Sequence, residues 1–327
     1  MLKLRGSHGS EISLLVIIIA LSIVLSLSTN TFLTVGNLTS VLNSSAVNII
    51  FAVGLLVVLV SGGVDISFSV AASIVQYVAV LILLSIGGGN WVIGFVLACA
   101  LGSILGMVNA FLIRNLKMIS IIVTISTLNI YFGLLLYFTD GVSIYNLPDW
   151  LLKNFVLYEY EMAGGNWFEI TVPVVVMAFC VVVTWALLTR TSTGRQLFAF
   201  GDNAEGARRF GINVAFIQYF AYGWLGVMAG IAGLMQVYYT KEVVPHAMLG
   251  RELDVLAAAV LGGARLGGGR GSVSGCVLGV LLVTITQNGL NLMGVSPFAF
   301  KMVVGLVFGI AITLSSLNFG SGRVRSV

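Results

Sequence analysis

An acidic residue without a basic neighbour stands between two long apolar runs. Asp65 lies within Gly62-Gly63-Val64-Asp65-Ile66-Ser67. A carboxylate buried in lipid without a partner is costly, so this position calls for a role. Three roles fit. The glycines break a helix and expose polar groups around Asp65, Ser67 and Ser69 near a translocation path, the carboxylate caps the following helix, or it relays protons.

A second polar stretch runs from Thr189 to Val214 and has the pattern of a capped helix. Asn203 is placed to cap a short helix from Ala204 to about Phe210, with an acid in its first turn and two arginines in its last turn. Gly211 provides a left-handed stop. Such a helix between two apolar spans suits either a soluble protein partner or a lipid surface with anionic headgroups.

The third unusual stretch is the glycine-rich segment from Leu261 to Gly271. Glycine-rich turns can bind phosphate, but no Lys followed by Ser or Thr comes after the last glycines, as a nucleotide-binding loop requires. The chain is therefore not expected to hydrolyse nucleotide. Close helix packing together with a break in a helix is the favoured interpretation.

Composition places the elements that carry these stretches in a membrane. The 327 residues are 58% hydrophobic and 9% charged, with a mean hydropathy of +1.07. Soluble domains carry about 25% charged residues, so a soluble fold is excluded. The expected fold is an all-α polytopic membrane protein with about ten transmembrane helices, some broken or re-entrant, and a short cytoplasmic coupling helix.

Apolar segments of the length that crosses a bilayer define those helices. They lie near 12–29, 46–61, 68–86, 91–113, 118–138, 170–189, 214–238, 253–263, 273–290 and 299–317. The segment 253–263 is too short to cross the bilayer alone. No long linker is visible, so one transmembrane domain over 1–327 is expected.

The charges orient these spans. If the spans alternate, most basic residues fall on one side, which the positive-inside rule assigns to the cytoplasm. The acidic loop 139–169 then lies outside, the segment 190–213 lies inside, and both termini lie inside. This loop divides the spans into two groups of five, an arrangement compatible with inverted repeats. Because the basic residues sit in short loops, membrane lipid and not nucleic acid is the expected contact.

Other chemistry finds little support in the residue pattern. Cys99, Cys180 and Cys276 are isolated in apolar runs and are expected to be small packing residues. The two histidines, His8 and His246, form no catalytic pattern with carboxylates. No enzyme activity, metal site or cofactor is therefore expected. The apolar run after Lys3 and Arg5 is expected to be a retained first span.

Four motifs in order resemble the permease subunits of ribose-type ABC importers. They are GGVDIS at 62–67, TGRQLFAFGDNAEGARRFGINV at 193–214, GRELDVLAAAVLGGARLGGGRGSVSGCVLG at 250–279 and QNGLNLMGVS at 287–296. This carbohydrate uptake family includes permeases for ribose, xylose, arabinose, galactose, galactofuranose and autoinducer-2. The resemblance covers about 37–309 and is specific for the family, but not for the sugar.

The resemblance implies a homodimer, or a heterodimer with a similar permease, that carries ATPase subunits inside and a periplasmic or lipid-anchored binding protein outside. In the bacterial inner membrane, the ATPases would move the permease by alternating access. The implied coupling contacts are Asp202, Asn203, Glu205, Gly206, Ala207, Arg208 and Arg209. The acidic loop, with Lys241, Glu242, Arg251 and Glu252, would face the binding protein.

The chain departs from the family pattern at Phe68, where a small residue is usual. This ring either narrows the path or faces lipid. A neutral sugar crossing the bilayer needs polar uncharged partners, and the candidate pathway residues are Asp65, Ser67, Phe68, Asn129, Gln287, Asn288 and Asn291. The last three share one helix face by spacing. A stand-alone secondary transporter that couples an ion through Asp65 is the alternative function.

Overall fold

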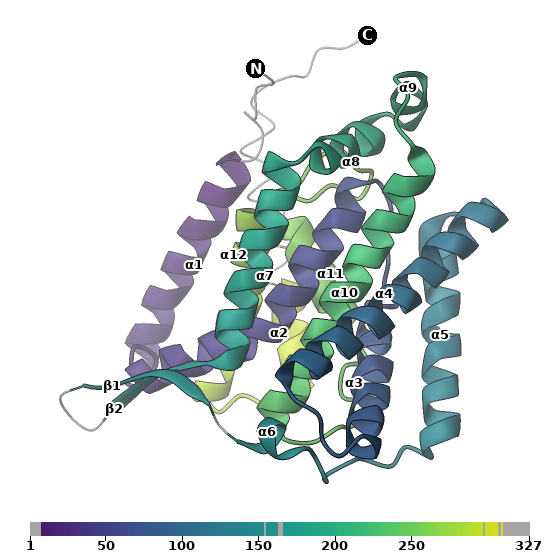
Figure 1. Ribbon diagram of the computed structural model, residues 1–327. Coiled ribbons are helices and arrows are strands. Elements are labelled where there is room, and N and C mark those ends of the chain that lie inside the picture. Colours follow the sequence, from purple (N-terminus) through teal and green to yellow (C-terminus); the bar gives the residue numbers. More distant parts are fainter. Residues whose placement is uncertain (1–7, 154, 163–165, 297, 307–308, 310–327) are drawn as a thin grey trace.

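The computed structural model describes residues 8–153, 155–162, 166–296, 298–306 and 309, and helices dominate it (Figure 1). The first five long helices precede a short helix and a hairpin. They are α1 (His8–Ser28), α2 (Val35–Val60), α3 (Phe68–Ser85), α4 (Trp91–Leu116) and α5 (Ser120–Thr139), followed by α6 (Asp149–Leu152), β1 (Val156–Met162) and β2 (Asn166–Thr171). The remaining elements are α7 (Val172–Arg190), α8 (Ser192–Asp202), α9 (Ala204–Arg209), α10 (Val214–Thr240), α11 (Arg251–Leu261) and α12 (Val273–Leu292).

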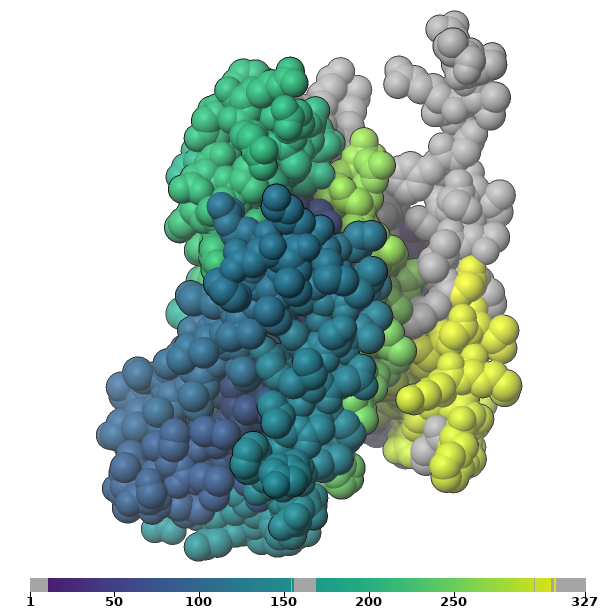
Figure 2. Space-filling view, turned by 90° about the vertical axis from the view of Figure 1, so that its right-hand side faces the viewer, coloured from purple at the N-terminus to yellow at the C-terminus, as the bar shows by residue number. Residues whose placement is uncertain are grey.

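The bundle has two distinct ends, which we call the α9 end and the hairpin end. Helices α8 and α9 lie at the first, and β1, β2 and α6 lie at the other (Figure 1). In Figure 2 the green surface that includes α9 stands at one end, above the blue surface of α4 and α5. Since the long helices run between these ends, the two sets of connecting loops are well separated.

Eight helices of the described chain are long and apolar enough to cross a membrane. The prediction of an all-α polytopic membrane protein is confirmed. Helix α11 spans Arg251–Leu261, so the expected segment 253–263 is indeed too short to cross alone. Of the expected segment 299–317, residues through 306 are helical, and most of the rest lies outside the described residues.

Helix α2 forms the centre of the bundle, where α7, α10, α11 and α12 contact it. From Ala46 to Val60 its sequence is almost wholly apolar, and every residue of this stretch other than Asn48 is buried. A helix that is apolar on all sides is typical of a position surrounded by other helices. The helix begins at Val35, well before the predicted 46, because Thr34 caps it by accepting from the Asn37 N–H.

Helices α4 and α10 touch along their backbones, and glycines make this contact. A Cβ atom at Gly102 would lie 2.1 Å from the Gly226 carbonyl oxygen, and one at Gly226 would lie 2.1 Å from the Gly102 carbonyl oxygen. One turn away, a Cβ atom at Gly230 would lie 2.0 Å from the Ala98 carbonyl oxygen. Pairs of small residues four positions apart let transmembrane helices approach this closely.

Candidate pathway and coupling surface

The segment around Asp65 connects α2 to α3. Gly62 has φ +85°, a left-handed conformation that glycine adopts without strain, and residues 63–67 are not helical. A Cβ atom at Gly63 would lie 2.5 Å from the Tyr222 hydroxyl oxygen of α10. The predicted helix break at the two glycines is therefore present, and both glycines are required by conformation or space.

The Asp65 carboxylate is enclosed by hydrogen bonds. One of its oxygens accepts from the Ser67 backbone N–H at 2.7 Å and from the Ser67 hydroxyl at 2.8 Å. The other accepts from the Asn109 amide of α4 at 3.0 Å. Asp65 is 2% exposed and forms no salt bridge with the described part of the chain. Three donors stabilise the charge in place of a cation, and one of them is the N–H just before α3.

A second buried carboxylate lies close by along α3. The Ser69 hydroxyl donates to Glu252 at 2.5 Å, and Glu252 also accepts from the Gly250 N–H at 2.9 Å. Arg251 donates to the Gln236 side chain at 3.1 Å. The prediction that Glu252 faces an external partner is wrong, because this side chain is buried and bound to α3. It holds the start of α11 against the beginning of α3.

Phe68 is also buried, at 2% exposure, and its ring lies 5.1 Å from the ring of Phe51 on α2. The lipid-facing interpretation is therefore wrong for this residue. The ring occupies the interior immediately after the Asp65 turn, where a small residue would leave space between α2 and α3.

The other predicted pathway residues lie elsewhere. Asn129 is exposed on α5 and donates to the carbonyl of Ile125 within its own helix at 2.8 Å. Asn288 on α12 exchanges hydrogen bonds of 3.0 and 2.8 Å with Asn37 on α2. Gln287 is half-buried and Asn291 is exposed. The structure brings Asp65, Ser67 and Phe68 together. The three α12 residues and Asn129 lie away from that cluster.

Helix α9 has the predicted caps. The Asn203 side chain accepts from the Gly206 N–H at 2.8 Å, Gly211 has φ +80°, and the Gly211 N–H donates to the Arg208 carbonyl at 3.0 Å. Glu205 and Arg209 form an exposed ion pair at 3.3 Å. Of the predicted coupling contacts, Ala207 is buried and Gly206 is half-buried, and the others are exposed: Asp202, Asn203, Glu205, Arg208 and Arg209.

Two features of this segment were missed in the sequence. Helix α8 precedes α9, begins at the Thr191 cap, which accepts from the Gly194 N–H at 3.0 Å, and buries Leu197 fully. Phe210 is 90% exposed at the tip of α9. Its signal is an aromatic residue directly after two arginines in a polar loop, and an exposed aromatic of this kind is typical of a protein contact.

The three unusual stretches meet at the α9 end. A Cβ atom at Gly201 of α8 would lie 1.9 Å from the Val60 carbonyl oxygen, and one at Gly268 would lie 2.6 Å from the Gly201 carbonyl oxygen. The Gly269 N–H donates to the Val60 carbonyl at 2.9 Å. We call Gly62, Gly201, Gly268 and Gly269 the glycine junction. It joins α8 directly to the end of α2 and to the loop before α12.

The glycine-rich segment from Leu261 to Gly271 has the predicted helix break, and the predicted close helix packing is found beside it. Helix α11 ends at Leu261, and a Cβ atom at Gly262 would lie 2.3 Å from the Gly275 carbonyl oxygen of α12. A Cβ atom at Gly279 would lie 2.0 Å from the Ala258 carbonyl oxygen. The glycines thus let α11 pack on α12 on both sides of the break.

At the hairpin end, the long acidic loop is attached to the loop after α10. Ile144 and Val243 exchange backbone hydrogen bonds of 3.0 Å. The Lys241 ammonium donates to the Leu151 carbonyl at 2.8 Å and lies 3.8 Å from the centre of the Tyr238 ring. Partial burial lowers the pKa of Lys241. These contacts hold the acidic loop against the end of α10 at Ile144 and Leu151, and the β1–β2 hairpin within the loop was not predicted.

Comparison with known proteins shows the family. A family model described as "Branched-chain amino acid transport system / permease component" matches residues 37–312. The ribose import permease RbsC of Bacillus subtilis is 35% identical over 90% of this chain and 89% of its own length. The autoinducer 2 import permease LsrC of Photorhabdus luminescens is 32% identical over 99% of this chain and 93% of its own length.

A third relative is the galactose/methyl galactoside import permease MglC of Salmonella typhimurium, which is 28% identical over 93% of each chain. No solved structure matches this chain. The family match spans most of the sequence and includes the Asp65 turn, α8 and α9, the glycine junction and α12. The chain therefore belongs to this family of transport-system permease components.

Proposed function

We propose that this chain is the membrane permease subunit of an ATP-binding-cassette importer that carries a small sugar or sugar-like solute into the cytoplasm. The observation that carries the proposal is the capped, charged α9 helix, which directly follows α8, together with the glycine junction, which joins α8 to the segment that holds Asp65. The import permeases similar to this chain are named for ribose, galactose and autoinducer 2. A solute of that class is therefore the expected cargo.

The α9 end faces the cytoplasm in this proposal. Arg114, Lys117 and Arg208 line one hollow there, and the loop with Arg265 and Arg270 touches Gly201 of α8 through Gly268. Clusters of Lys and Arg in short loops favour the cytoplasmic side. The hairpin end then faces outward, both termini lie inside, and the membrane is the inner membrane of a bacterium.

A cytoplasmic ATPase subunit binds α9. Arg208, Arg209 and Phe210 present two charges and an aromatic ring on an exposed helix tip, and Asp202, Asn203 and Glu205 lie beside them. Closure of the ATPase around nucleotide would displace α9. Because Gly201 touches both Val60 and Gly268 through backbone atoms, this displacement reaches α2 and the loop before α12 without a flexible side chain between them.

The Asp65 segment responds to that displacement. It begins at Gly62 in the junction and ends at Phe68, whose ring packs on α2. A shift of Gly62 changes how Asp65 and Ser67 lie against Asn109 of α4. We therefore assign Asp65, Ser67 and Phe68 to the moving wall of the path. Hydrogen bonds from both serine and asparagine keep the charge compensated in the state described.

A second permease would cover the two exposed pathway candidates. Asn129 and Asn291 are exposed in one chain, where lipid would be a poor partner for their amides. A homodimer, or a heterodimer with a similar permease, would cover them. Gln287 and Asn288 lie next to Asn291 on α12 and belong to the same wall. A periplasmic or lipid-anchored binding protein would deliver the solute at the acidic hairpin end.

Reversing the charge of α9 tests the coupling. Arg208→Glu with Arg209→Glu should abolish ATP-dependent uptake of labelled ribose, galactose and autoinducer 2 into vesicles that hold the permease, its ATPase and its binding protein. The matched control is Arg190→Glu, an arginine at the end of α7 that lies over the Trp185 ring. Both variants should insert normally. Normal ATP-dependent uptake in the double variant would remove the coupling assignment.

The same assay decides between importer and ion-coupled carrier. Uptake by the unaltered protein should require ATP inside the vesicle and the binding protein. Uptake that continues without ATP and stops when the proton or sodium gradient is removed would contradict the importer proposal and would give Asp65 an ion-coupling role.

A further inference from the structure

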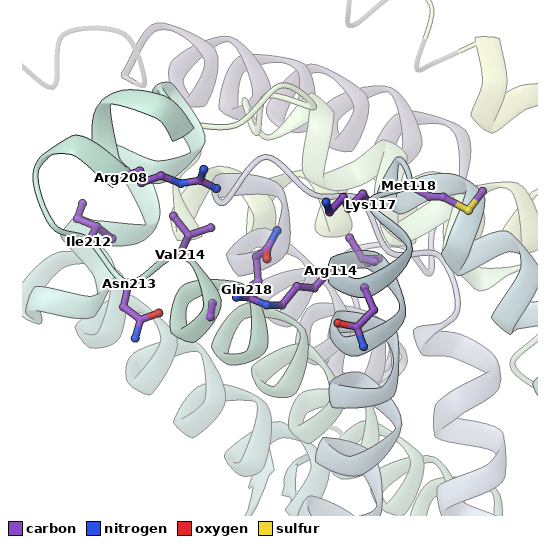
Figure 3. A pocket seen from close by; sticks show the side chains of 11 residues that line it. Arg114, Lys117, Met118, Arg208, Ile212, Asn213, Val214 and Gln218 are labelled. Carbon is purple, nitrogen blue, oxygen red and sulfur yellow. The ribbon is translucent and has the colours of Figure 1, made fainter.

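A hollow at the α9 end collects three cationic side chains. Its volume is about 920 Å³, and it lies between the end of α4, the loop to α5, and the loop between α9 and α10. Figure 3 shows Arg114, Lys117 and Arg208 extending toward the same opening, with Gln218 between them. No acidic residue lines this hollow in the described part of the chain, and the three cations have no ion pair there. The site is complementary to an anion.

The start of α10 adds to this electrostatic field. Val214 and Ala215, in its first turn, line the hollow, and the helix continues to Thr240. The free N–H groups of a helix start carry partial positive charge. Asn213 accepts from the Phe216 N–H at 3.1 Å, which leaves other N–H groups of that turn for a ligand. The strongest contribution remains the three side-chain charges.

A second, apolar groove lies on the same two helices, α4 and α10, further from the end of α4. It has a volume of about 300 Å³ and is lined by Ile104, Met107, Val108 and Phe111 of α4 and by Tyr219 of α10. Residues three and four apart share one face of a helix, so this stripe leads directly to Arg114 and Asn115. Phe111 and Ile104 lie about 8 and 18 Å before the end of α4, at a rise of about 1.5 Å per residue.

We infer that this composite site binds one anionic phospholipid of the cytoplasmic leaflet. The phosphate headgroup lies among Arg114, Lys117 and Arg208, and an acyl chain lies in the groove between α4 and α10. A basic pocket between transmembrane helices on the cytoplasmic side is typical of sites for anionic headgroups. A second copy of this chain is a poorer occupant, because its own α9 end carries the same cations and would be repelled.

Arg208 connects the proposed lipid site to the coupling helix α9. Arg208 is in the last turn of α9 and lines the hollow, next to Arg209 and Phe210 of the proposed ATPase contact, so a lipid bound here would hold the coupling helix beside the end of α4. The lipid would therefore stabilise one position of α9 relative to the bundle. Phosphate is the chemical group recognised, but the groove below it distinguishes a lipid from free phosphate.

Native mass spectrometry of the purified full chain tests the inference. Protein from nanodiscs of phosphatidylcholine with one-tenth phosphatidylglycerol should retain phosphatidylglycerol. Since a cation near an anionic surface contributes about 1 kcal/mol, Arg114→Gln with Lys117→Gln should weaken retention by roughly 25-fold, about fivefold per charge. Met107→Trp, which fills the groove and leaves the cations intact, should also reduce retention. Arg190→Gln is the matched control and should retain the lipid.

Each of the following outcomes would contradict the assignment of the hollow as a phospholipid site. Equal retention of both phospholipids, or unchanged retention in the double variant, would show that the hollow is not a lipid site. Displacement of phosphatidylglycerol by millimolar inorganic phosphate would assign it to a soluble anion. Loss of ATPase co-purification in the double variant, with lipid retention intact, would make it a protein contact, and a change of oligomeric state would make it a contact between copies.

Discussion

Glycine is used in two different ways in this molecule. Between α4 and α10, glycines sit within regular helices and let two long helices touch along their length. At the glycine junction, Gly62, Gly268 and Gly269 have φ of +85°, +85° and +71°, and the contact joins a helix end, a short surface helix and a loop. The first contact is repeated turn after turn, whereas the second is a single crossing of three chain segments.

This difference indicates two mechanical roles. The α4–α10 pair is expected to act as a rigid scaffold, and the glycine junction is expected to be the place where segments move relative to that scaffold. Helices α4 and α10 are locked by reciprocal contacts, so a relative shift of one would force many backbone atoms together. Among the described residues, one backbone hydrogen bond crosses between segments of the junction, from the Gly269 N–H to the Val60 carbonyl, and these segments lie at the end of the bundle. We therefore expect α4 and α10 to move as one body, and α8 and α9 to move relative to it.

The largest effect is expected from breaking the scaffold. Gly226→Leu places a branched side chain where even a Cβ atom lies 2.1 Å from the Gly102 carbonyl oxygen. Overpacking of this kind costs about 3 kcal/mol or more, because the helices must separate. The apparent Tm in detergent and the yield of monodisperse protein should both collapse. Gly133→Leu is the control, since nothing lies within 4 Å of a Cβ atom at Gly133. Equal Tm values for the two variants would contradict the scaffold.

A second variant disturbs the junction. Gly201→Ala places a methyl group against the Val60 carbonyl oxygen, and the hydrogen bond from Gly269 to Val60 must lengthen. ATP-dependent uptake should fall by at least about tenfold, which corresponds to about 1.4 kcal/mol of lost coupling. The apparent Tm should fall much less than in Gly226→Leu. Gly36→Ala, at a site with open space, is the control. A collapse of Tm with uptake would show that the junction belongs to the scaffold.

The long helices could be predicted because each is an apolar run with polar residues or glycine at its limits. The segment 68–86 was predicted and α3 spans Phe68–Ser85, and the capped α9 followed from Asn203 and Gly211. The first turns of α2 were missed because Asn37, Asn43 and Ser44 lower the local hydropathy. Helix α8 was missed for a similar reason, since it lies on the surface and buries one narrow face.

The site could be predicted in its parts but not in its assembly. Gly62, Gly201 and Gly268 are far apart in the sequence, and no helical spacing rule relates them. The burial of Glu252 was also missed, since an acid between Arg251 and Leu253 is typical of an exposed loop. Its partner Ser69 comes from another helix, and tertiary packing alone decides that pairing.

A smaller effect is expected from substitutions of Asp65, which lies in the segment that connects the glycine junction to α3. Asp65→Asn keeps an oxygen that accepts from the Ser67 N–H, so uptake should stay within about threefold and stability should fall by about 1 kcal/mol. Asp65→Leu leaves the Ser67 and Asn109 donors unpaired and should cost about 1–3 kcal/mol for each. For both variants, uptake rates from pH 5.5 to 8.5 measure activity, and the apparent Tm measures stability. Loss of all uptake in Asp65→Asn, with normal Tm, would point to ion coupling.

The smallest effect is expected on the surface of α9. Glu205→Gln breaks the 3.3 Å ion pair with Arg209, and exposed pairs at this spacing contribute about 0.3–0.5 kcal/mol. Asn203→Ala removes the cap of the same helix and should cost about 1 kcal/mol. Uptake should therefore fall more in Asn203→Ala than in Glu205→Gln. If the order is reversed, the Glu205 carboxylate itself contacts the ATPase, and the position of α9 depends on the partner more than on its own caps.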